Sequence, residues 1–436
     1  MLKSFTVKKY RNLNINNLNF GKLNLIIGPN NAGKSNLIDA LNFSSSVMTN
    51  EHDNNSKKFS YYKTSFLNEL QKRGWNDILD RHSKKPNSIE LSWVLSTFEN
   101  LPALKYSLKF KVPSDHHTPP EDFEITSEKL NYASPQEGQL APFEFISCHS
   151  KKQGIGKFSV KQRTLTSAPK TVSLNVSNKD SVLNQLESLL EEEVFRLDLY
   201  PNFKKTATHV TNFFTRFRSY RSTDFNLSEV KKPIKSNLNS NWLEFDAKNF
   251  VNVLAFLEKK YSFLKKYEQI IKEILPDLDK ITIEQIDDTY SYLQLTINKR
   301  HFKLSEMSDG TIKMLLMALI LWSPEKYSLL SLDEPELNIH PAWLRKLANW
   351  IKLSNSYEQI FVSSHSPDFL DGFTDYFSED LLSLLVFNVT NSKQEKDINN
   401  QVNIVKKESL ITQLEQGWEL GDLYRIGEPR LGGWPW

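Results

Sequence analysis

The sequence has almost no cysteine and no long hydrophobic run, and each shortage excludes a class of protein. Cys148 is the single cysteine among 436 residues, so no intrachain disulfide can form, and a reducing cytoplasm is the expected location. The longest apolar stretch, residues 314–322, is about half of what a bilayer span requires. The first residues lack the apolar segment of a signal peptide. We therefore expect a cytoplasmic protein that has no membrane partner.

The sequence also lacks a strong excess of one charge. It has 55 Lys and Arg against 52 Asp and Glu, a net charge of +3, and this total does not decide whether nucleic acid binds, because binding depends on where basic groups cluster. With 39% hydrophobic and 25% charged residues, the composition is that of a globular protein and excludes disorder. No internal repeat and no heptad run long enough for a coiled-coil arm is present.

One segment has the pattern of a phosphate-binding loop, G-x-x-x-x-G-K-[ST]: Gly28-Pro29-Asn30-Asn31-Ala32-Gly33-Lys34-Ser35. Residues 23–27 predict a buried strand before it and residues 34–43 a helix after it, which is the context that this motif requires. The two glycines let backbone N–H groups converge on a phosphate, and the helix adds its positive end. Lys34 can then reach the β- and γ-phosphates of a nucleotide, and the Ser35 hydroxyl can bind magnesium.

Two acids follow a second apolar run, residues 329–332. Asp333 is placed to hold magnesium, directly or through water, and Glu334 to orient the water that attacks the γ-phosphate. An apolar strand that ends in Asp-Glu can also be a strand that runs out into solvent, and the acids alone leave this alternative open. Together with the phosphate loop they favour a nucleotide site.

A histidine and a serine complete the candidate site. His365 follows a third apolar run, residues 361–362, and is a candidate sensor of the γ-phosphate; a histidine at the surface or capping the core is the alternative. Ser308 and Gly310 precede an apolar helix predicted over residues 311–322, where a hydroxyl and an amide at a helix N-terminus can bind an anion. A plain N-cap before a core helix describes the same two residues.

We expect an α/β fold, a P-loop NTPase head with an inserted antiparallel β-sheet and helical subdomain. Alternating residues over 89–112 and 143–176 predict the strands of the insert. Residues 249–275 predict one helix, and residues 282–299 predict two strands. The expected domains are 1–45 with the phosphate loop, 46–210 as the insert, and 211–436 as the second part of the head with the acids and the histidine.

With these pieces in order, the chain resembles the ABC-type AAA ATPases of the RecF and SMC group. More narrowly, it is similar to RecF-like ATPases of prokaryotic defence loci, which are related to the ATPase part of overcoming-lysogenization-defect proteins and to the ATPase of PARIS-type systems. The resemblance covers roughly the first tenth and the last third of the chain. The segments that carry it are Leu2-Lys3-Ser4-Phe5, Tyr10-Arg11-Asn12-Leu13, Gly28 to Ser35, Met307 to Thr311, Asp333-Glu334-Pro335-Glu336, Ile339-His340-Pro341, Ser364-His365-Ser366-Pro367, and Gly421-Asp422-Leu423-Tyr424 to Gly432-Gly433.

The resemblance implies a role for each site residue. Glu334, His365 and Lys34 would be catalytic, and Ser35 and Asp333 would hold Mg²⁺. Ser308 and Gly310 would act in trans, on the ATP of a second copy. The remaining ATP contacts implied are Arg11, Asn30, Asn31, Ala32, Gly33, Lys34, Ser35 and Asn36.

Two departures from the family pattern are visible. The signature reads Ser-Asp-Gly (residues 308–310) rather than the double-glycine form of transporters. A glutamine that would contact magnesium cannot be placed, and Gln71 and Gln153 are candidates by sequence position alone.

The resemblance also implies partners. Two copies, or a higher oligomer, would close on ATP through their heads. Relatives with their own nuclease add a Toprim domain after the histidine strand, and residues 367–436 are too few for one and lack its acidic cluster. We therefore expect an ATPase that regulates or scaffolds a separate effector in anti-phage defence, a Toprim-type nuclease being one candidate.

Two other functions stay open. A RecF-like repair ATPase would clamp DNA, and basic residues exist for this at Arg216, Arg218 and Arg221, although residues 213–220 are also typical of a core strand or helix. In a binding scaffold ATP would be only a structural ligand, which the intact Glu334 argues against. The C-terminal residues 432–436 carry two tryptophans that would dock on the core or on a partner.

Overall fold

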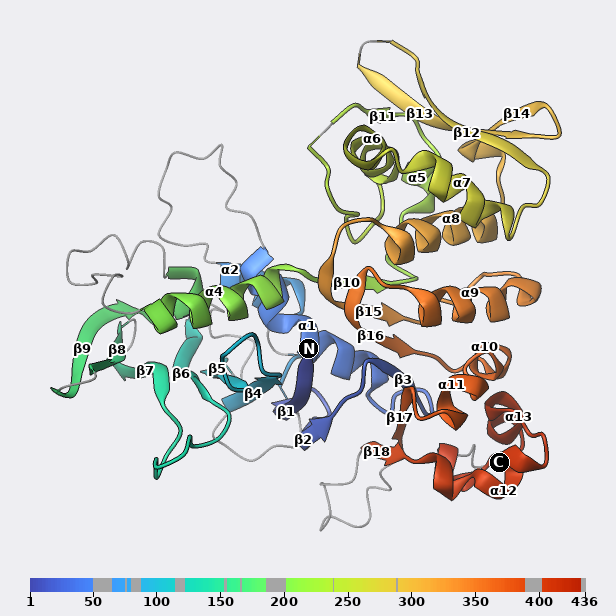
Figure 1. Cartoon of the computed structure of the whole chain (residues 1–436). Coiled ribbons are helices and arrows are strands. Elements are labelled where there is room, and N and C mark those ends of the chain that lie inside the picture. The colour runs from blue at the N-terminus through green and yellow to red at the C-terminus, as the bar shows by residue number, and fades with distance from the viewer. Residues whose placement is uncertain are drawn as a thin grey trace. The chain divides into compact units, whose positions relative to one another are not determined.

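The computed structural model describes residues 1–49, 65–74, 77–79, 88–113, 122–152, 155–164, 167–185, 201–237, 239–287, 289–388 and 402–432. The chain divides into two compact units (Figure 1). Unit 1 comprises Met1–Gly21, Asn30–Phe217 and Asn388–Asn403, and unit 2 comprises Lys22–Pro29, Arg218–Phe387 and Ile404–Trp436. No helix within the described ranges is both long and apolar enough to cross a membrane.

Unit 1 is built on an eight-stranded sheet in which every pair of adjacent strands is antiparallel. The strands are, in spatial order, β2 (Leu13–Asn19), β1 (Leu2–Tyr10), β4 (Ser88–Leu95), β5 (Leu104–Lys111), β6 (Glu124–Tyr132), β7 (Glu144–Lys152), β8 (Ile155–Thr164) and β9 (Ser167–Ser177). The predicted strands over 89–112 and 143–176 are confirmed. Strand β6 was not predicted, because its buried positions do not alternate regularly.

Three helices of unit 1 pack around aromatic side chains. Helix α1 (Lys34–Thr49) contacts α2 (Ser65–Lys72), α4 (Pro201–Thr215) and strand β1. Phe43 of α1 stacks on Phe110 of β5 at 5.2 Å, and Phe66 of α2 meets both rings edge-on. These buried aromatic contacts fix the helix that follows the phosphate loop against the antiparallel sheet.

Unit 2 contains a six-stranded sheet that has a parallel centre. Its order is β10 (Phe217–Arg221), β15 (Tyr327–Asp333), β16 (Tyr357–Ser363), β3 (Leu23–Ile27), β17 (Leu382–Phe387) and β18 (Val402–Val405). The pairs β15–β16, β16–β3 and β3–β17 are parallel. Every residue of β3 and β15 is buried, as expected for parallel strands covered on both faces. The predicted α/β fold is confirmed.

Helices and a smaller sheet complete unit 2. The mainly apolar helix α8 (Asp309–Trp322) has a buried residue at each position from Thr311 to Leu321. The smaller sheet contains β11 (Ile234–Lys235), β12 (Leu278–Gln285), β13 (Tyr290–Ile297) and β14 (Arg300–Lys303). The other helices are α5 (Leu227–Val230), α6 (Phe250–Tyr261), α7 (Leu264–Lys272), α9 (Pro341–Leu353), α10 (Pro367–Asp371), α11 (Thr374–Ser378), α12 (Ile411–Glu415) and α13 (Leu420–Arg425), with short 3₁₀ turns at Leu304–Glu306, Lys407–Ser409 and Pro429–Leu431.

One predicted helix is two helices. Residues 249–275 form α6 and α7, which are separated at Ser262, where φ is +53°. Ser262 donates its N–H to the Glu258 carbonyl, and the Glu258 carboxylate accepts from the N–H of Leu264 at 2.7 Å. The prediction of one continuous helix was wrong because this local capping ends α6 in a left-handed residue, which apolar spacing does not reveal.

The predicted domain limits of 1–45, 46–210 and 211–436 stay a prediction. The pairing of β1 with β4 places the first strands of the chain in the same sheet as the antiparallel strands of the insert. The C-terminal tryptophans Trp434 and Trp436, Gly433, Gly154 and Gln153 lie outside the described residues.

Candidate functional site

The first part of the phosphate loop leaves strand β3 at the carboxyl end of the parallel sheet in unit 2. Gly28 has a φ of +137°, and a Cβ atom there would lie 2.5 Å from the carbonyl oxygen of Phe387. Only glycine can combine this φ with so close a backbone. The Tyr424 hydroxyl donates to the Gly28 carbonyl at 3.4 Å. The start of the loop is therefore held by strand β17 and helix α13.

The second part of the loop, in unit 1, leads into helix α1. Asn31 and Gly33 both have positive φ, at +62° and +116°, which turns successive backbone N–H groups toward one side of the loop. The Asn12 amide donates to the carbonyls of Asn31 and Ala32, each at 3.4 Å. Lys34, the first residue of α1, is buried. Asn12 is a loop-bracing residue that the sequence analysis quoted without giving it a role.

Arg11 lies beside the same helix. Its guanidinium donates to the Asn36 side-chain oxygen at 3.3 Å and pairs with the Asp39 carboxylate at 3.1 Å. Asn36 in turn donates to the Asn12 side chain at 2.8 Å. The structure thus brings three sequence candidates for ATP contact, Arg11, Asn36 and the loop backbone, into one polar network of unit 1.

The acids that follow β15 lie at the carboxyl edge of the parallel sheet. Asp333 pairs in register with Ser363 of β16, and Ser363 pairs with Ile26 of β3. The last residues of three neighbouring parallel strands therefore end at one edge, where open parallel sheets place their ligands. Asp333 and the strand that precedes Gly28 therefore end at the same edge of this sheet, within unit 2.

Asp333 is buried, at 3% exposure, with a donor on each carboxylate oxygen. The Ser363 hydroxyl donates to Oδ1. Arg221, at the end of β10, donates Nε to Oδ2 at 3.0 Å. A buried carboxylate is costly without a cation nearby, and here a guanidinium supplies the positive charge.

Glu334 and His365 face each other at this edge. Glu334 has a φ of +51°, a conformation that non-glycine residues rarely adopt and that is found at functional sites. Its N–H donates to the Ser363 carbonyl at 3.1 Å. His365 Nδ1 lies 3.1 Å from Glu334 Oε1, and because an ionised carboxylate only accepts, Nδ1 carries the proton of this bond. The pair can hold a water and take up its proton.

Glu336 ties the acidic loop to the histidine loop. It is buried, and its Oε1 accepts from the Ser364 hydroxyl at 2.5 Å and from the His365 N–H at 3.4 Å. Burial raises the pKa of Glu336 above its usual value. Oε2 makes no hydrogen bond within the described part of the chain. In the sequence Glu336 is only one residue of the Asp-Glu-Pro-Glu motif. Its role in joining the acidic loop to the histidine loop is visible only in the structure.

These residues fit a divalent cation. Asp333 offers a carboxylate that already holds a positive group, and hydroxyls and carboxylates are the oxygen donors that Mg²⁺ prefers. In the described ranges no group of three or more His, Cys, Asp or Glu side chains could hold a metal ion. Phosphate-loop sites do not need such a group, because nucleotide oxygens and water complete the coordination.

The start of helix α8 is a second region with sequence candidates. Ser308 is exposed and caps the helix, since its Oγ accepts from the Thr311 N–H at 3.2 Å. The two open hypotheses, a plain N-cap and an anion site facing another molecule, share this geometry. Ser308 and Gly310 line a hollow of about 580 Å³, together with Asn338, Ile339, His340, Ala342 and Trp343.

Helix α8 is tied internally to the acidic loop. A Cβ atom on Gly310 would lie 3.0 Å from the Asn338 carbonyl oxygen. The buried Lys313 ammonium donates to the Ser222 hydroxyl at 2.8 Å and to the Leu337 carbonyl at 2.9 Å. Burial lowers the pKa of Lys313. Ser222 also donates its N–H to the Asp333 carbonyl at 3.1 Å, so one polar chain joins the sheet edge to α8.

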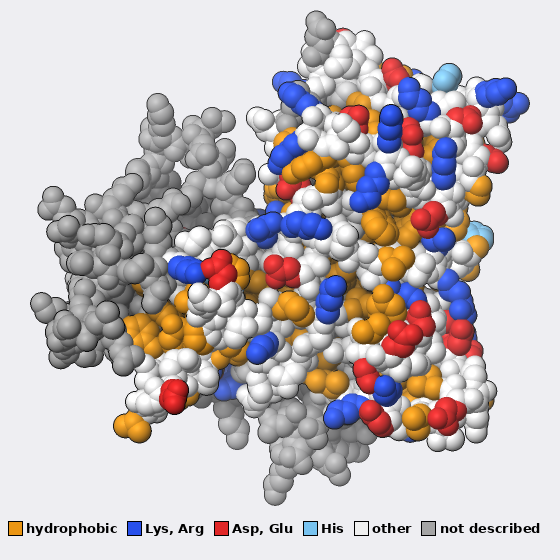
Figure 2. All heavy atoms as spheres, viewed as in Figure 1, with side chains coloured by type: hydrophobic (Ala, Val, Ile, Leu, Met, Phe, Trp, Pro, Cys, Tyr) orange, Lys and Arg blue, Asp and Glu red, His pale blue; other side chains and the backbone are white. Residues whose placement is uncertain are grey.

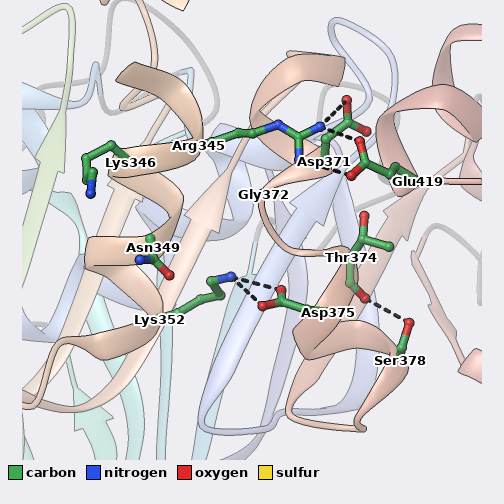
Figure 3. A pocket seen from close by; sticks show the side chains of 10 residues that line it. All are labelled: Arg345, Lys346, Asn349, Lys352, Asp371, Gly372, Thr374, Asp375, Ser378 and Glu419. Carbon is green, nitrogen blue, oxygen red and sulfur yellow. Dashed lines mark hydrogen bonds and ion pairs between the residues drawn. The ribbon is translucent and has the colours of Figure 1, made fainter. Parts of the chain in front are cut away.

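Another hollow, of about 630 Å³, lies between α9 and the segment that contains α10 and α11 (Figure 3). Its cations have acidic partners: Arg345 bonds to Glu419 and Lys352 to Asp375 at 2.7 Å. Glu419 stands at the start of α13. These pairs fasten α9 to the start of α13 and to α11, which explains the hollow as a structural feature.

Two of the three arginines counted toward DNA binding, Arg218 and Arg221, have internal partners. Arg218 lies 4.7 Å from the Trp242 ring and 4.8 Å from the Tyr327 ring, and Arg221 pairs with Asp333. Phe213, Phe214, Phe217 and Tyr220 are all buried, as the core interpretation of this segment predicted. Figure 2 shows acidic and basic side chains interspersed over the face of unit 2 in view.

The candidate glutamines gain no support. Gln71 is exposed on α2, within unit 1. Among the described residues of unit 1, no hydrogen bond joins the Gln71 side chain to a site residue. Gln153 lies outside the described ranges. The magnesium-contacting glutamine therefore stays unplaced.

Comparison with solved structures finds SMC head domains. The SmcHead bound to the C-winged helix domain of ScpA has a TM-score of 0.46 and 11% identity, over 94% of this chain and 99% of that one. The head domain from Thermotoga maritima gives 0.40 and 13%, over 93% and 98%. An Smc head with an extended coiled coil, bound to the C-terminal domain of ScpA derived from Pyrococcus furiosus, gives 0.41 and 11%, over 95% and 98%.

A protein family gives the stronger comparison. Its sequence profile matches residues 23–111 and 155–371, from strand β3 through helix α10, which is more than half of the chain. No curated protein matches the chain. The match confirms the predicted AAA ATPase of the P-loop type. The chain belongs to the family described as "AAA domain, putative AbiEii toxin, Type IV TA system".

Proposed function

We propose that this chain binds and hydrolyses ATP with Mg²⁺, and that two copies close on the nucleotide through their heads. The observation that carries this proposal is the meeting of Asp333, Glu334 and His365 at the sheet edge from which the phosphate loop departs. Family membership supports the same conclusion.

Each residue has a part in the proposed reaction. Backbone N–H groups of residues 30–33 and the Lys34 ammonium bind the phosphates, and Arg11 reaches the same region through its hydrogen bond to Asn36 of α1. Ser35 and Asp333 would hold Mg²⁺, which neutralises phosphate charge when bound. Glu334 orients water and takes its proton, and the His365 ring positions that carboxylate and faces the γ-phosphate. Ser308 and Gly310 complete the site of a second copy.

The Glu334→Gln variant tests this assignment. It keeps the shape of the side chain but cannot accept the proton, so we expect turnover to fall about 10²-fold or more while ATP binding is retained. ATP hydrolysis, nucleotide binding and mass in solution with MgATP measure this, and the variant should accumulate as a dimer. Glu358→Gln, an exposed glutamate on β16, is the matched control. Wild-type turnover in the Glu334 variant would remove it from the catalytic role.

Ser308→Ala tests the trans contact. Losing a donor to transition-state charge should lower turnover about 10²-fold, while nucleotide binding by one copy stays unchanged. Ser305→Ala, at an exposed serine nearby, is the control. A wild-type rate that does not change with protein concentration in a strictly monomeric sample would contradict the trans site.

We further propose that the ATPase regulates or scaffolds a separate effector, such as a Toprim-type nuclease, in anti-phage defence. The family description names a toxin of a toxin–antitoxin system, which supports a role in growth arrest or defence. The test is phage plating on cells that carry the native locus with wild-type or Glu334→Gln protein. Equal plating efficiencies would remove the defence role and leave the ATPase assignment intact.

A DNA clamp is the alternative function. The internal partners of Arg218 and Arg221 reduce its support. DNA-stimulated hydrolysis with a steep salt dependence would favour it.

A further inference from the structure

Arg11 has an unfavourable backbone conformation in the tight turn between β1 and β2. Tyr10 pairs with Leu13 across this turn, so Arg11 and Asn12 are its two central residues. The φ of Arg11 is +52°, in the left-handed region that non-glycine residues rarely adopt. Its N–H donates to the Ile78 carbonyl at 2.7 Å, which helps to hold the turn. Such conformations concentrate at functional sites, so the position of the Arg11 side chain calls for an explanation.

The Arg11 guanidinium is held by two side chains of helix α1. Nη1 donates to Asn36 Oδ1 at 3.3 Å, and Nη2 lies 3.1 Å from Asp39 Oδ2. Asn36 and Asp39 are three residues apart and share one face of the helix, just after the phosphate loop. A guanidinium has five N–H donors, and the Arg11 side chain is 31% exposed. It can therefore keep both partners and still donate to a negatively charged ligand.

Asp39 is itself fixed from its other side by Arg73, the residue after helix α2. Arg73 Nε donates to Asp39 Oδ1 at 2.9 Å, and its Nη1 donates to Glu69. The Arg73 side chain is only 10% exposed. The Tyr10 hydroxyl donates to Asp39 Oδ2 at 2.7 Å. The two carboxylate oxygens thus have different partners: Oδ1 bonds the buried Arg73, and Oδ2 bonds Tyr10 and Arg11.

We propose that Asp39 is a positioning residue that holds the Arg11 guanidinium beside the phosphate loop, so that its remaining N–H groups donate to the phosphates of ATP. This inference rests on the proposed function, in which ATP binds at this loop. A planar guanidinium in a fixed orientation suits phosphate oxygens. Because Arg73 fixes Asp39 before nucleotide arrives, less side-chain freedom is lost on binding, which favours affinity.

Asp39→Asn removes this hold while leaving that of Arg73 in place. The asparagine amide oxygen can still accept from Arg73 Nε, and the amide nitrogen then replaces Oδ2. The Tyr10 hydroxyl can rotate to accept from that nitrogen, but a guanidinium has no acceptor. Arg11 therefore loses its partner on this side. We expect the affinity for MgATP to fall about 10-fold, measured by titration with a fluorescent ATP analogue.

Combination with Arg11→Ala shows whether Asp39 acts through Arg11. Arg11→Ala alone should lower the affinity for MgATP by about 10-fold or more, since hydrogen bonds between charged groups are lost. In that background Asp39→Asn should cause no further loss, because the side chain that it positions is already gone. A purely structural role of Asp39 would instead give the same loss of affinity with and without Arg11.

Two control variants make the test specific. Tyr10→Phe removes the other hydrogen bond to Asp39 Oδ2 and should lower the unfolding temperature without changing the affinity for MgATP. Glu90→Gln breaks a different ion pair of strand β1, that of Lys8 with Glu90 at 3.5 Å, and should leave the affinity unchanged.

A second substitution keeps the test usable if Asp39→Asn does not fold. Asp39→Glu retains the charge and both acceptor oxygens for Arg73 and Tyr10, but it moves them by one bond length. It should cause a smaller loss of MgATP affinity, and this loss should again disappear in the Arg11→Ala background.

Three results would overturn the inference. An unchanged affinity in Arg11→Ala would show that Arg11 does not contact the nucleotide. An equal loss from the Asp39 substitution with and without Arg11 would make its role purely structural. A loss in Tyr10→Phe as large as that in Asp39→Asn would show that any break in this network disturbs the loop. Failure of the wild-type chain to bind MgATP would instead contradict the proposed function, so the two failures are distinguishable.

Discussion

The two units each bury a carboxylate completely, but they surround it with different partners. In unit 2, Asp333 has a guanidinium on one oxygen and a hydroxyl on the other. In unit 1, the donors to Glu128 of β6 from the described residues are all neutral: the Tyr106 and Ser181 hydroxyls and the N–H groups of Val182 and Leu183. In the first environment a cation lies beside the acid that is proposed to hold the metal, and in the second neutral donors tie a strand to the segment that begins at Ser181. Burial of an acid alone therefore does not identify a ligand site, whereas the charge of its partner does.

The largest expected difference between the two acids is in nucleotide binding. Asp333→Asn removes the charge that a metal would neutralise, so MgATP affinity should fall at least about 100-fold, the upper end of what loss of an outer-shell partner costs. Glu128→Gln should leave MgATP affinity unchanged. Calorimetric titration of both variants measures this. Similar losses of affinity in both would show that Asp333 acts through the fold, as Glu128 does.

A buried cation extends the comparison. Within the described ranges the acceptors of Lys313 are neutral, the Ser222 hydroxyl and the Leu337 carbonyl, so Lys313 should have a structural role like that of Glu128. Lys313→Met leaves both acceptors without this donor, and we expect about 1–3 kcal/mol of lost stability by urea denaturation. Lys259→Met, on the exposed side of α6, should cost less than about 0.5 kcal/mol. Equal losses of stability in Lys313→Met and Lys259→Met would contradict the structural role of Lys313.

The smallest expected effect is the pH dependence of Glu128. Burial raises its pKa from 4.5 to about 7, so the folded chain binds this proton more tightly than the unfolded chain does. Its contribution to stability is fully present below pH 4.5 and is lost as the pH rises through 7. Relative to Glu128→Gln, the wild type should lose up to about 1.4 kcal/mol per pH unit in that window. Unfolding temperatures at pH 5 and pH 7 measure this, and an equal change in the two proteins would contradict it.

Sequence reasoning succeeded where the signal is local. The buried strand, glycine loop and helix around Gly28 and Lys34 are consecutive in the chain, and the apolar run before Asp333 is a complete parallel strand. It could also be anticipated that the residues after these strands lie close together, because the carboxyl ends of neighbouring parallel strands share one edge of their sheet. The α/β fold follows from these elements.

The features that could not be predicted from the sequence depend mostly on contacts between residues far apart in the chain. Arg221 and Asp333 are 112 residues apart, and no spacing rule connects them. The sequence therefore suggested a nucleic-acid role for an arginine that pairs with an acid of the site. Asn12 braces the phosphate loop from 20 residues upstream of Ala32, and a lone asparagine gives no signal. The break at Ser262 depends on one left-handed residue, which propensity does not specify.

The brace on Gly28 has a consequence for the order in which the protein forms. Strand β3 lies between β16 and β17, and Tyr424, which bonds the Gly28 carbonyl, leaves the ribosome 396 residues after it. At translation rates of about 5–20 residues per second, that interval lasts about 20–80 s. Until β16 and β17 have been synthesised, the phosphate loop is present as sequence but has no sheet to leave from. The proposed ATP site therefore forms among the last features of the newly made chain.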